Sequence, residues 1–343
     1  MKLKNMNKKF YALCPANYET GGIELVHQFI DYINNIGKEG YIVYFDNNDN
    51  FIDAKIPDSY TSYNIRKSNS IPDIENSVVV LPEVCLYFSK KFNNTKFLFW
   101  WMSYDNYFEN SGLIDFTSFA ISTKLSFKKF LGKFYRHKSK RQFTFNDIKR
   151  INNRVIHGYQ SQYVHNKLFN KGLFNQLPLS DYINKSYYNK DQTQRREDII
   201  LYNPAKGFEV TKKIIETVKD YQFIPLKGLN RDELRDLFTR AKLYIDFGNH
   251  PGKDRIPREA ALQGCVILVG KKGSAKYFED VLLNNDKKMD SNEIIKISSK
   301  IKHIMQNFEN EHKSLSLYRD VILEEEKKFF SEIDFIINSF NFI

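Results

Sequence analysis

Residues 243–270 read LYIDFGNHPGKDRIPREAALQGCVILVG, and this stretch decides the fold. Leu243–Phe247 and Val266–Gly270 are short and almost wholly apolar, which is typical of buried strands. Between them, Pro257–Gly264 begins with a proline and ends with a glycine, the usual limits of a short helix. The order strand, helix, strand indicates a parallel sheet with helical crossovers.

The same alternation precedes this stretch. We expect strands at Asp198–Asn203 and Gln222–Leu226, and helices at Phe208–Tyr221 and Asn230–Ala241. Asn230 and Glu233 have the spacing of a capping box, in which the two side chains accept hydrogen bonds from each other's backbone. Together these elements predict one Rossmann-like domain.

A second series of strands and helices lies in the N-terminal half. An apolar stripe from Ile23 to Ile33 predicts an amphipathic helix after the first strand. Strand-like runs are expected at Phe10–Cys14, Tyr41–Phe45, Val78–Leu81, Lys96–Trp101, Phe119–Ser122 and Arg154–Tyr159, and a further helix at Gln162–Lys171. The chain is therefore expected to be α/β, with two Rossmann-like domains facing each other across a cleft.

The two domains are expected to cover residues 1–182 and 195–328. The stretch Leu177–Gln194, which overlaps the end of the first domain, is polar and predicts a linker. The tail from Asn292 onward has a helical pattern. Its aromatic-rich end, residues 329–343, is expected to form a C-terminal helix that crosses back and packs on the first domain.

The composition excludes several classes of protein. The 343 residues are 42% hydrophobic and 15% aromatic, which argues against intrinsic disorder and against collagen-like sequences. The apolar runs are far shorter than the ~20 residues of a membrane span, and no signal peptide is expected. Three separated cysteines offer no metal spacing and no even disulfide set, which favours the cytoplasm.

The formal net charge of +11 is concentrated in one segment. Residues 124–154 contain eleven Lys or Arg and a single acid, Asp147, a net charge of +10. Aromatic residues alternate with these cations, as in segments that bind anionic membranes. A solvated loop and a nucleic-acid contact remain open alternatives. The expected membrane-docking or acceptor-docking residues are Lys128, Lys129, Lys138, Lys140 and Arg141.

Glycine-containing turns follow several expected strands, at the sheet edge where such folds bind ligands. Gly21 and Gly22 precede Glu24 at the start of a helix, whose N–H groups suit an anion. Lys206 and Gly207 follow the first strand of the second domain, where a flexible lysine suits a diphosphate. A plain turn and a surface lysine are the simpler interpretations. Gly273 lies in another basic turn, 270–274.

The most informative turn is residues 250–258. Lys253, Arg255 and Arg258 lie within six residues at a helix start, where cations oppose the helix dipole. Such a local conflict is typical of a functional site, so we expect an anionic ligand there. Glu259, one turn into the helix, is placed to accept two hydroxyl groups of a ribose.

With these motifs, the sequence resembles GT-B glycosyltransferases, in particular the family-4-like bacterial group that builds capsules and lipopolysaccharide. The resemblance covers most of residues 10–285. Gly21, Gly22 and Glu24 resemble that family's nucleotide-sugar loop, and Lys206-Gly207 its phosphate-contacting lysine. Residues 258–267 resemble its signature helix, and residues 100–105 and 157–163 resemble recurring stretches of capsule transferases.

The resemblance implies transfer from a nucleoside-diphosphate sugar without a cofactor or a bound metal. The sequence agrees in having no Asp-x-Asp motif. Basic groups would stabilise the departing diphosphate, while Asp105 or Glu24 would serve as the base in an inverting reaction. Retaining members usually carry a glutamate eight positions before the helix glutamate, where this chain has Pro251. His250 or Asp254 can take its place, so inversion and retention both stay open.

The expected partners are a nucleotide-sugar donor, a lipid-linked glycan acceptor and the inner face of the cytoplasmic membrane. An epimerase or hydrolase of the same fold is an alternative, although such enzymes usually need more carboxylates in the cleft. A nucleic-acid-binding protein is disfavoured because no zinc-finger spacing or RNA-recognition signature is present. A dehydrogenase is disfavoured because no G-x-G-x-x-G follows the first strand.

Overall fold

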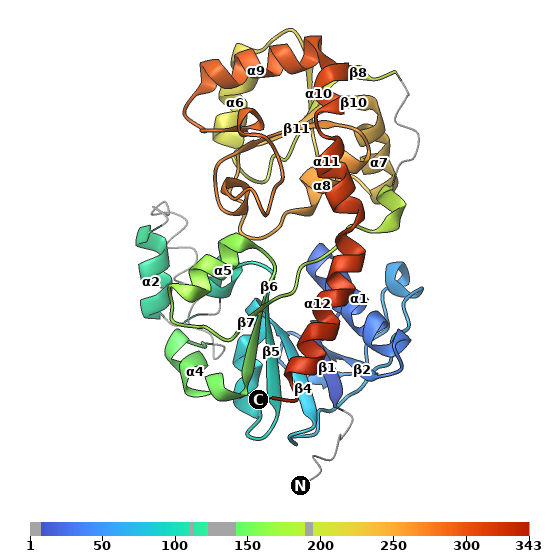
Figure 1. Ribbon diagram of the computed structural model, residues 1–343, viewed down its shortest axis with the longest axis vertical. Helices are drawn as coiled ribbons and strands as arrows, with labels where there is room; N and C mark the ends of the chain where they lie inside the picture. Colours follow the sequence, from blue (N-terminus) through green and yellow to red (C-terminus); the bar gives the residue numbers. More distant parts are fainter. Residues whose placement is uncertain (1–7, 110, 112, 123–141, 189–194, 343) are drawn as a thin grey trace. The chain divides into compact units, whose positions relative to one another are not determined.

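The computed structural model describes residues 8–109, 111, 113–122, 142–188 and 195–342. The chain divides into two compact units, each with its own sheet of mainly parallel strands (Figure 1). The first unit consists of Met1–Gln160, Val164–Ser180 and Phe329–Ile343. The second consists of Ser161–Tyr163 and Asp181–Lys328.

The sheet of the first unit has the strand order β3-β2-β1-β4-β5-β6-β7. All neighbours are parallel except β2 and β3. Its strands are β1 Lys9–Pro15, β2 Glu39–Phe45, β3 Phe51–Ile52, β4 Ser77–Pro82, β5 Lys96–Trp101, β6 Val155–Tyr159 and β7 Gln176–Pro178. Its helices are α1 Gly21–Asn35, α2 Leu113–Ser122, α4 Phe145–Arg150, α5 Gln162–Phe169 and α12 Glu325–Ser339. The first residues of α5 and of α12 belong to the second unit.

Helix α1 shows why the sequence folds in this way. Thr20 caps its first turn by accepting a hydrogen bond from the backbone N–H of Ile23 at 3.4 Å. Phe29, Ile30 and Ile33 are fully buried, so the apolar stripe seen in the sequence is the face that packs on the sheet. Helix α12 lies beside α1 (Figure 1), with the ring of Phe330 stacked on Tyr32 at 4.3 Å.

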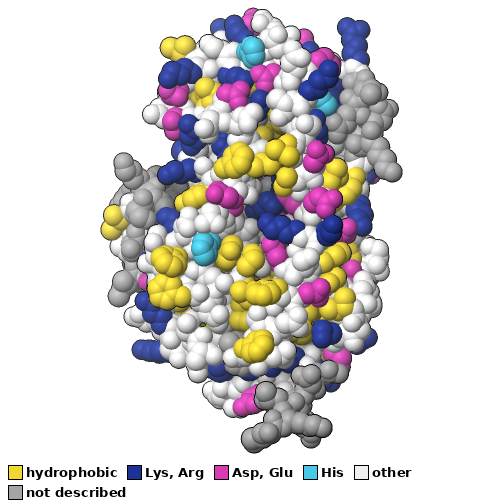
Figure 2. Space-filling view, in the orientation of Figure 1, with side chains coloured by type: hydrophobic (Ala, Val, Ile, Leu, Met, Phe, Trp, Pro, Cys, Tyr) yellow, Lys and Arg dark blue, Asp and Glu magenta, His cyan; other side chains and the backbone are white. Residues whose placement is uncertain are grey.

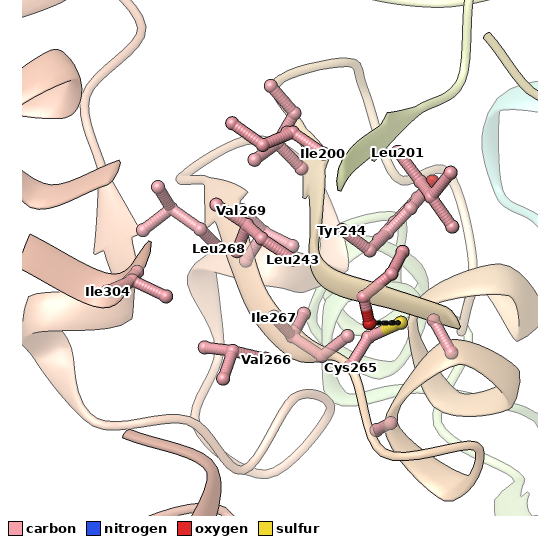
Figure 3. Packing of buried hydrophobic residues seen from close by; sticks show 14 of the residues in the cluster. Ile200, Leu201, Leu243, Tyr244, Cys265, Val266, Ile267, Leu268, Val269 and Ile304 are labelled. Carbon is pink, nitrogen blue, oxygen red and sulfur yellow. Dashed lines mark hydrogen bonds between the residues drawn. The ribbon is translucent and has the colours of Figure 1, made fainter. Parts of the chain in front are cut away.

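The sheet of the second unit has the order β12-β11-β10-β8-β9, and its strands are parallel throughout. The strands are β8 Glu197–Tyr202, β9 Gln222–Pro225, β10 Ala241–Asp246, β11 Val266–Gly270 and β12 Lys288–Met289. The helices are α6 Phe208–Thr217, α7 Arg231–Arg240, α8 Arg255–Leu262, α9 Ile294–Gln306, α10 Phe308–Lys313 and α11 Ser316–Leu323. Figure 3 shows the apolar side chains of β8, β10 and β11 meeting in the core of this unit.

Short 3-10 helices connect several of these elements. They are η1 Asp58–Tyr60, η2 Glu83–Lys91, η3 Asp105–Glu109, η4 Asn152–Arg154, η5 Lys185–Tyr187, η6 Ser274–Lys276 and η7 Asn285–Lys287. Among the described residues, no helix has both the length and the apolar composition that a membrane span requires.

The structure confirms the alternation and the Asn230–Glu233 capping box, but it corrects two expectations. Phe119 lies in helix α2 rather than in a strand, and its ring stacks on Phe108 of η3 at 4.1 Å. The expected linker 177–194 is not a free polar segment in its described part, because β7 joins the sheet there and Leu179, Asp181 and Ile183 are buried. Tertiary packing outweighed local composition at both places.

Candidate functional site

Three turns of the second unit meet at one edge of its sheet. Strands β11, β10 and β8 are neighbours, and their carboxyl ends are Gly270, Asp246 and Tyr202. The turns that follow these strands cover residues 271–274, 247–254 and 203–207. Open α/β folds bind their ligands at the carboxyl ends of the parallel strands.

The turns after β10 and β11 are joined by their backbones. His250 and Gly273 form an isolated β-bridge, and Ser274 N donates a hydrogen bond to the carbonyl of His250 at 2.8 Å. Ser274 Oγ donates to the carbonyl of Gly252 at 2.6 Å. Gly273 has a φ of +62°, and a Cβ atom there would overlap the carbonyl oxygen of His250. The predicted site residue Gly273 therefore holds two turns together.

Lys206 occupies the middle of a buried charge cluster. Its ammonium group forms ion pairs with Asp254 and, at 3.3 Å, with Asp246 Oδ2. The fully buried His250 places Nδ1 2.7 Å from Asp254 Oδ2. Burial opposes the charge of Lys206, but the two carboxylates outweigh it and raise the pKa of the lysine. Lys206 is thus held in its charged form.

The same cluster contains a possible set of metal ligands. Within the described ranges, Asp246, His250 and Asp254 each offer one ligand atom, and these atoms lie within 4.8 Å of one another. Carboxylate and imidazole ligands suit a divalent ion such as Zn²⁺. However, the ammonium group of Lys206 already pairs with both carboxylates. The ammonium group therefore places a positive charge where a divalent ion would otherwise bind.

The cations at the start of α8 are balanced by carboxylates of the protein itself. Arg255 Nε lies 3.4 Å from Glu259 Oε1, and Lys253 Nζ lies 2.6 Å from Glu325 Oε1. Arg258 pairs with both Asp181 and Glu325. Arg258, which is 1% exposed, therefore needs no external anion, contrary to the expectation from the sequence. The two carboxylates that neutralise Arg258 are distant in the sequence and close in the structure.

The predicted donor-side residues of the second unit nevertheless lie near one another, whereas Gly21 and Gly22 belong to the first unit. Lys206, Gly207, Gly273 and the loop 253–255 surround the same sheet edge, and Glu259 follows in α8. Lys253 and Arg255 keep 12% and 17% of their side-chain surface exposed, and Lys206 keeps 25%. The edge therefore combines three partly accessible cations with glycine backbone.

In the first unit, the predicted residues follow different strands. Gly21 and Gly22 begin α1, and a Cβ atom on Gly22 would lie 3.4 Å from Met102 Sδ. Glu24 is only 3% exposed, and its Oε1 accepts a hydrogen bond from the Tyr63 hydroxyl at 3.2 Å. Asp105 begins η3 after β5 and is half-buried. Strand β4 separates the strands that precede Glu24 and Asp105.

The carboxylate that follows this middle strand was not among the residues predicted from the sequence. Glu83 comes directly after β4, is 4% exposed, and accepts a hydrogen bond from Met102 N at 3.1 Å. Burial raises the pKa of Glu83 to about 7, although the N–H groups of Met102 and Ser103 and the Asn106 side chain oppose the shift. The sequence does contain a signal for this residue, because Glu83 directly follows the apolar run Val78–Pro82.

The first residue of the stretch 157–163 has a structural role. Trp101 Nε1 donates to His157 Nδ1 at 3.1 Å, and His157 Nε2 lies 3.0 Å from Asn152 Oδ1. Burial lowers the pKa of His157 to about 3, so this ring is neutral at physiological pH. Farther along, Asp280 accepts hydrogen bonds from the backbone N–H groups of Gln162 and Tyr163 at 2.6 and 3.0 Å.

The expected docking residues Lys128, Lys129, Lys138, Lys140 and Arg141 lie outside the described residues. On the described surface visible in Figure 2, Lys and Arg side chains are interspersed with Asp and Glu.

Several solved structures share this architecture. The chain is similar to a glycosyltransferase from Rickettsia africae ESF-5, with a TM-score of 0.59 and 12% identity, covering 96% of this chain and 99% of that one. It is similar to the trehalose-6-phosphate synthase OtsA, with a TM-score of 0.58 and 8% identity, covering 98% and 99%. TarM has a TM-score of 0.52 and 14% identity, and the likeness covers 78% of this chain and 56% of TarM.

Neither a protein-family model nor a curated protein sequence matches the chain. The structural likenesses show the fold, which is the two-domain Rossmann-like GT-B fold. This confirms the fold expected from the sequence.

Proposed function

We propose that the chain is a glycosyltransferase that moves a sugar from a nucleoside-diphosphate sugar to a glycan acceptor. The observation that carries the proposal is the sheet edge around Lys206, where Lys253 and Arg255 are also partly exposed. A diphosphate leaving group develops negative charge during transfer, and fixed cations stabilise that charge. Glu259 is the proposed ribose ligand.

We further propose that the reaction uses no metal ion. In metal-dependent transfer, a divalent ion balances the charge of the diphosphate. Here Lys206 is held charged by Asp246 and Asp254, and it would contribute a permanent cation at the same edge. Asp105 and Glu24 remain the proposed acceptor-side bases for an inverting reaction. Pro251 stands at the position of the retaining glutamate, and near it His250 Nδ1 lies 2.7 Å from Asp254 Oδ2.

The proposed acceptor is a lipid-linked glycan of cell-surface polysaccharide synthesis, such as a capsule or lipopolysaccharide. The support is the basic segment 124–154, which would hold the enzyme peripherally at the inner face of the cytoplasmic membrane. Replacing Lys128, Lys129, Lys138, Lys140 and Arg141 by Gln should abolish co-sedimentation with vesicles containing phosphatidylglycerol. Turnover of a soluble acceptor should survive. Equal binding of the unaltered chain to neutral and anionic vesicles would refute this docking role.

A donor panel tests the enzymatic proposal. The purified protein is incubated with UDP-, GDP-, ADP- and dTDP-sugars and a glycan acceptor, and the release of nucleoside diphosphate is measured together with transfer. Lys206→Ala should lower release at least about 100-fold, the usual scale for losing one charge-stabilising group. Lys242→Ala is the matched control, because Lys242 also pairs with an aspartate, Asp198 at 2.5 Å, but on the other end of β10.

The panel also separates the alternative function. Consumption of a donor without transfer to any acceptor would indicate a hydrolase or epimerase of the same fold. Binding of none of the nucleoside diphosphates would refute the proposed site. Unchanged activity in both Lys206→Ala and Glu259→Ala would remove these residues from the site.

A further inference from the structure

Arg258 is almost completely enclosed, and each of its nitrogens is engaged. Nη1 donates to Glu325 Oε2 at 2.6 Å, and Nη2 donates to Asp181 Oδ2 at 2.5 Å. Nη2 also donates to the carbonyl of Lys253 at 3.1 Å, and Nε donates to the carbonyl of Asp254 at 3.2 Å. The guanidinium group therefore donates four hydrogen bonds, two to carbonyls of the loop before α8 and two to carboxylates that are distant in the sequence.

Lys253 completes this buried cluster. Its Nζ forms an ion pair with Glu325 Oε1 at 2.6 Å, so Glu325 bridges Lys253 and Arg258. Burial opposes the charge of Arg258, but Asp181 and Glu325 outweigh it and keep the pKa above its ordinary value. Two cations and two carboxylates thus balance inside the unit. Because buried ion pairs stabilise a fold no better than apolar packing of equal volume, stability alone gives no reason for this arrangement.

The two carboxylates mark the ends of the long stretch of the second unit. Asp181 is the first residue of Asp181–Lys328, and Glu325 lies three residues before its last residue. Arg258 is separated from Asp181 by 77 residues and from Glu325 by 67. One side chain therefore fixes both ends of this stretch to the loop that precedes α8.

The loop fixed by Arg258 is the loop that holds Lys206. Asp254, whose carbonyl accepts from Arg258 Nε, uses its carboxylate to pair with Lys206 and with His250. The contacts therefore run from Asp181 and Glu325 through Arg258 to the backbone of Lys253 and Asp254, and from there to Lys206. A displacement of Arg258 would shift the cations at the sheet edge.

We infer that Arg258 is a positioning residue of the donor site and not a ligand of the donor. It fixes Lys253 and Asp254 for diphosphate binding and couples this loop to the chain segments at Asp181 and Glu325. The inference rests on the proposed function, because it assumes that a nucleoside diphosphate binds at this edge. It reassigns a residue that the sequence placed among the donor contacts.

Charge-neutral replacements of the two carboxylates distinguish positioning from direct contact. If Arg258 is a positioning residue, Glu325→Gln and Asp181→Asn should each weaken binding about ten-fold or more, since small displacements of binding groups are costly. If Arg258 contacts the diphosphate, removing a competing carboxylate should leave affinity unchanged or raise it. The two models therefore predict opposite directions.

The measurement is isothermal titration calorimetry with UDP, GDP and ADP, at a temperature where circular dichroism shows each variant folded. Glu326→Gln is the matched control, because Glu326 neighbours Glu325 but pairs at 2.8 Å with Lys185, whose side chain is 66% exposed. This control should bind like the unaltered chain. Arg258→Lys keeps the positive charge but loses the planar guanidinium group, so this variant should also bind the nucleoside diphosphate more weakly than the unaltered chain.

Hydrogen exchange provides a readout that a purely structural role would not change. Adding the nucleoside diphosphate should increase protection at residues 181–187 and 320–328 in the unaltered chain. In Glu325→Gln, the nucleotide should protect the loop around residue 254 without protecting residues 181–187.

The outcomes separate this inference from the proposed function. If the unaltered chain binds no nucleoside diphosphate, both are overturned. If it binds one and Glu325→Gln and Asp181→Asn bind as tightly or more tightly, the positioning role is overturned and the proposed function stands. Weaker binding in both variants, with an unchanged Glu326→Gln, supports the inference even if Arg258→Lys does not fold.

Discussion

Gly207 and Gly248 lie so close that a Cβ atom on Gly207 would be 2.5 Å from the backbone nitrogen of Gly248. The turn after β8 therefore packs directly on the turn after β10. A Cβ atom on Gly248 would in turn lie 2.6 Å from Lys206 Cγ, so the absent side chain leaves room for the lysine stem. This pair of glycines allows Lys206 to reach Asp246 and Asp254.

Replacing Gly207 by Ala should destabilise the second unit more than a positive φ alone would. Gly228 is the matched control, because it has a similar φ, +71° against +67°, but no atom of the described residues lies within 4 Å of its Cβ position. We expect about 1 kcal/mol of lost stability for Gly228→Ala from backbone strain, and about 2 kcal/mol more for Gly207→Ala from the clash. Urea unfolding measures both. Equal losses would show that the two turns separate easily.

Lys206 should keep divalent ions out of the cluster of Asp246, His250 and Asp254. Removing the ammonium group in Lys206→Ala leaves two carboxylates and an imidazole within reach of one another. We therefore expect the variant to bind Zn²⁺ with at least about ten-fold higher affinity than the unaltered chain, since the competing charge is gone. A Zn²⁺ titration measures the affinity, with Lys242→Ala as the control.

The opposite pattern would identify the cluster as a metal site. Tight Zn²⁺ binding by the unaltered chain, together with loss of nucleotide binding in EDTA, would contradict the role given to Lys206.

The parts of the fold that the sequence predicts well are those that depend on local pattern. Leu243–Phe247 and Val266–Gly270 are apolar because they are central strands, and β10 and β11 occupy nearly these ranges. The capping box depends on residues three apart, and the structure has it. The strands β3, β7 and β12 have two or three residues each, too few for any period to be visible in the sequence.

The site is less predictable, because its charges are balanced over long separations. The sequence identifies Lys206, Arg258 and Glu259 as candidates, but it gives no sign that Asp181 and Glu325 neutralise Arg258. Glu83 is similar, since its proximity to Met102 exists only once β4 and β5 are paired. Pairings between residues 19 to 77 positions apart are set by topology and not by local propensity.

Phe329 should anchor helix α12 on the first unit. Its side chain is fully buried, and its ring stacks on Trp100 with a centroid distance of 6.0 Å. We expect Phe329→Ala to lose about 3–5 kcal/mol. Phe335→Ala is the control on the same helix, because Phe335 is 58% exposed, and it should change stability by less than about 0.5 kcal/mol. Thermal unfolding compares the two, and a similar shift in both would contradict the anchoring role.

Glu83 should make the stability of the first unit fall as the pH rises. Burial raises the pKa of Glu83 from 4.5 to about 7, so between these values the folded chain holds a proton that the unfolded chain has lost. Stability therefore decreases as the pH rises through this range, by about 3 kcal/mol in total, and the loss levels off about one unit above the raised pKa. The carboxyl group is most favourable to folding when it is neutral.

Glu83→Gln removes this titration and keeps an oxygen that can accept from Met102 N. The variant should lack this group's contribution to the fall in stability between about pH 5 and 7, and it should be more stable than the unaltered chain at pH 8. Glu19→Gln, at an exposed glutamate of the same unit, should keep the slope of the unaltered chain. Unfolding midpoints measured from pH 4.5 to 8 test this. Parallel curves for the unaltered chain and Glu83→Gln would mean that burial does not raise the pKa of Glu83.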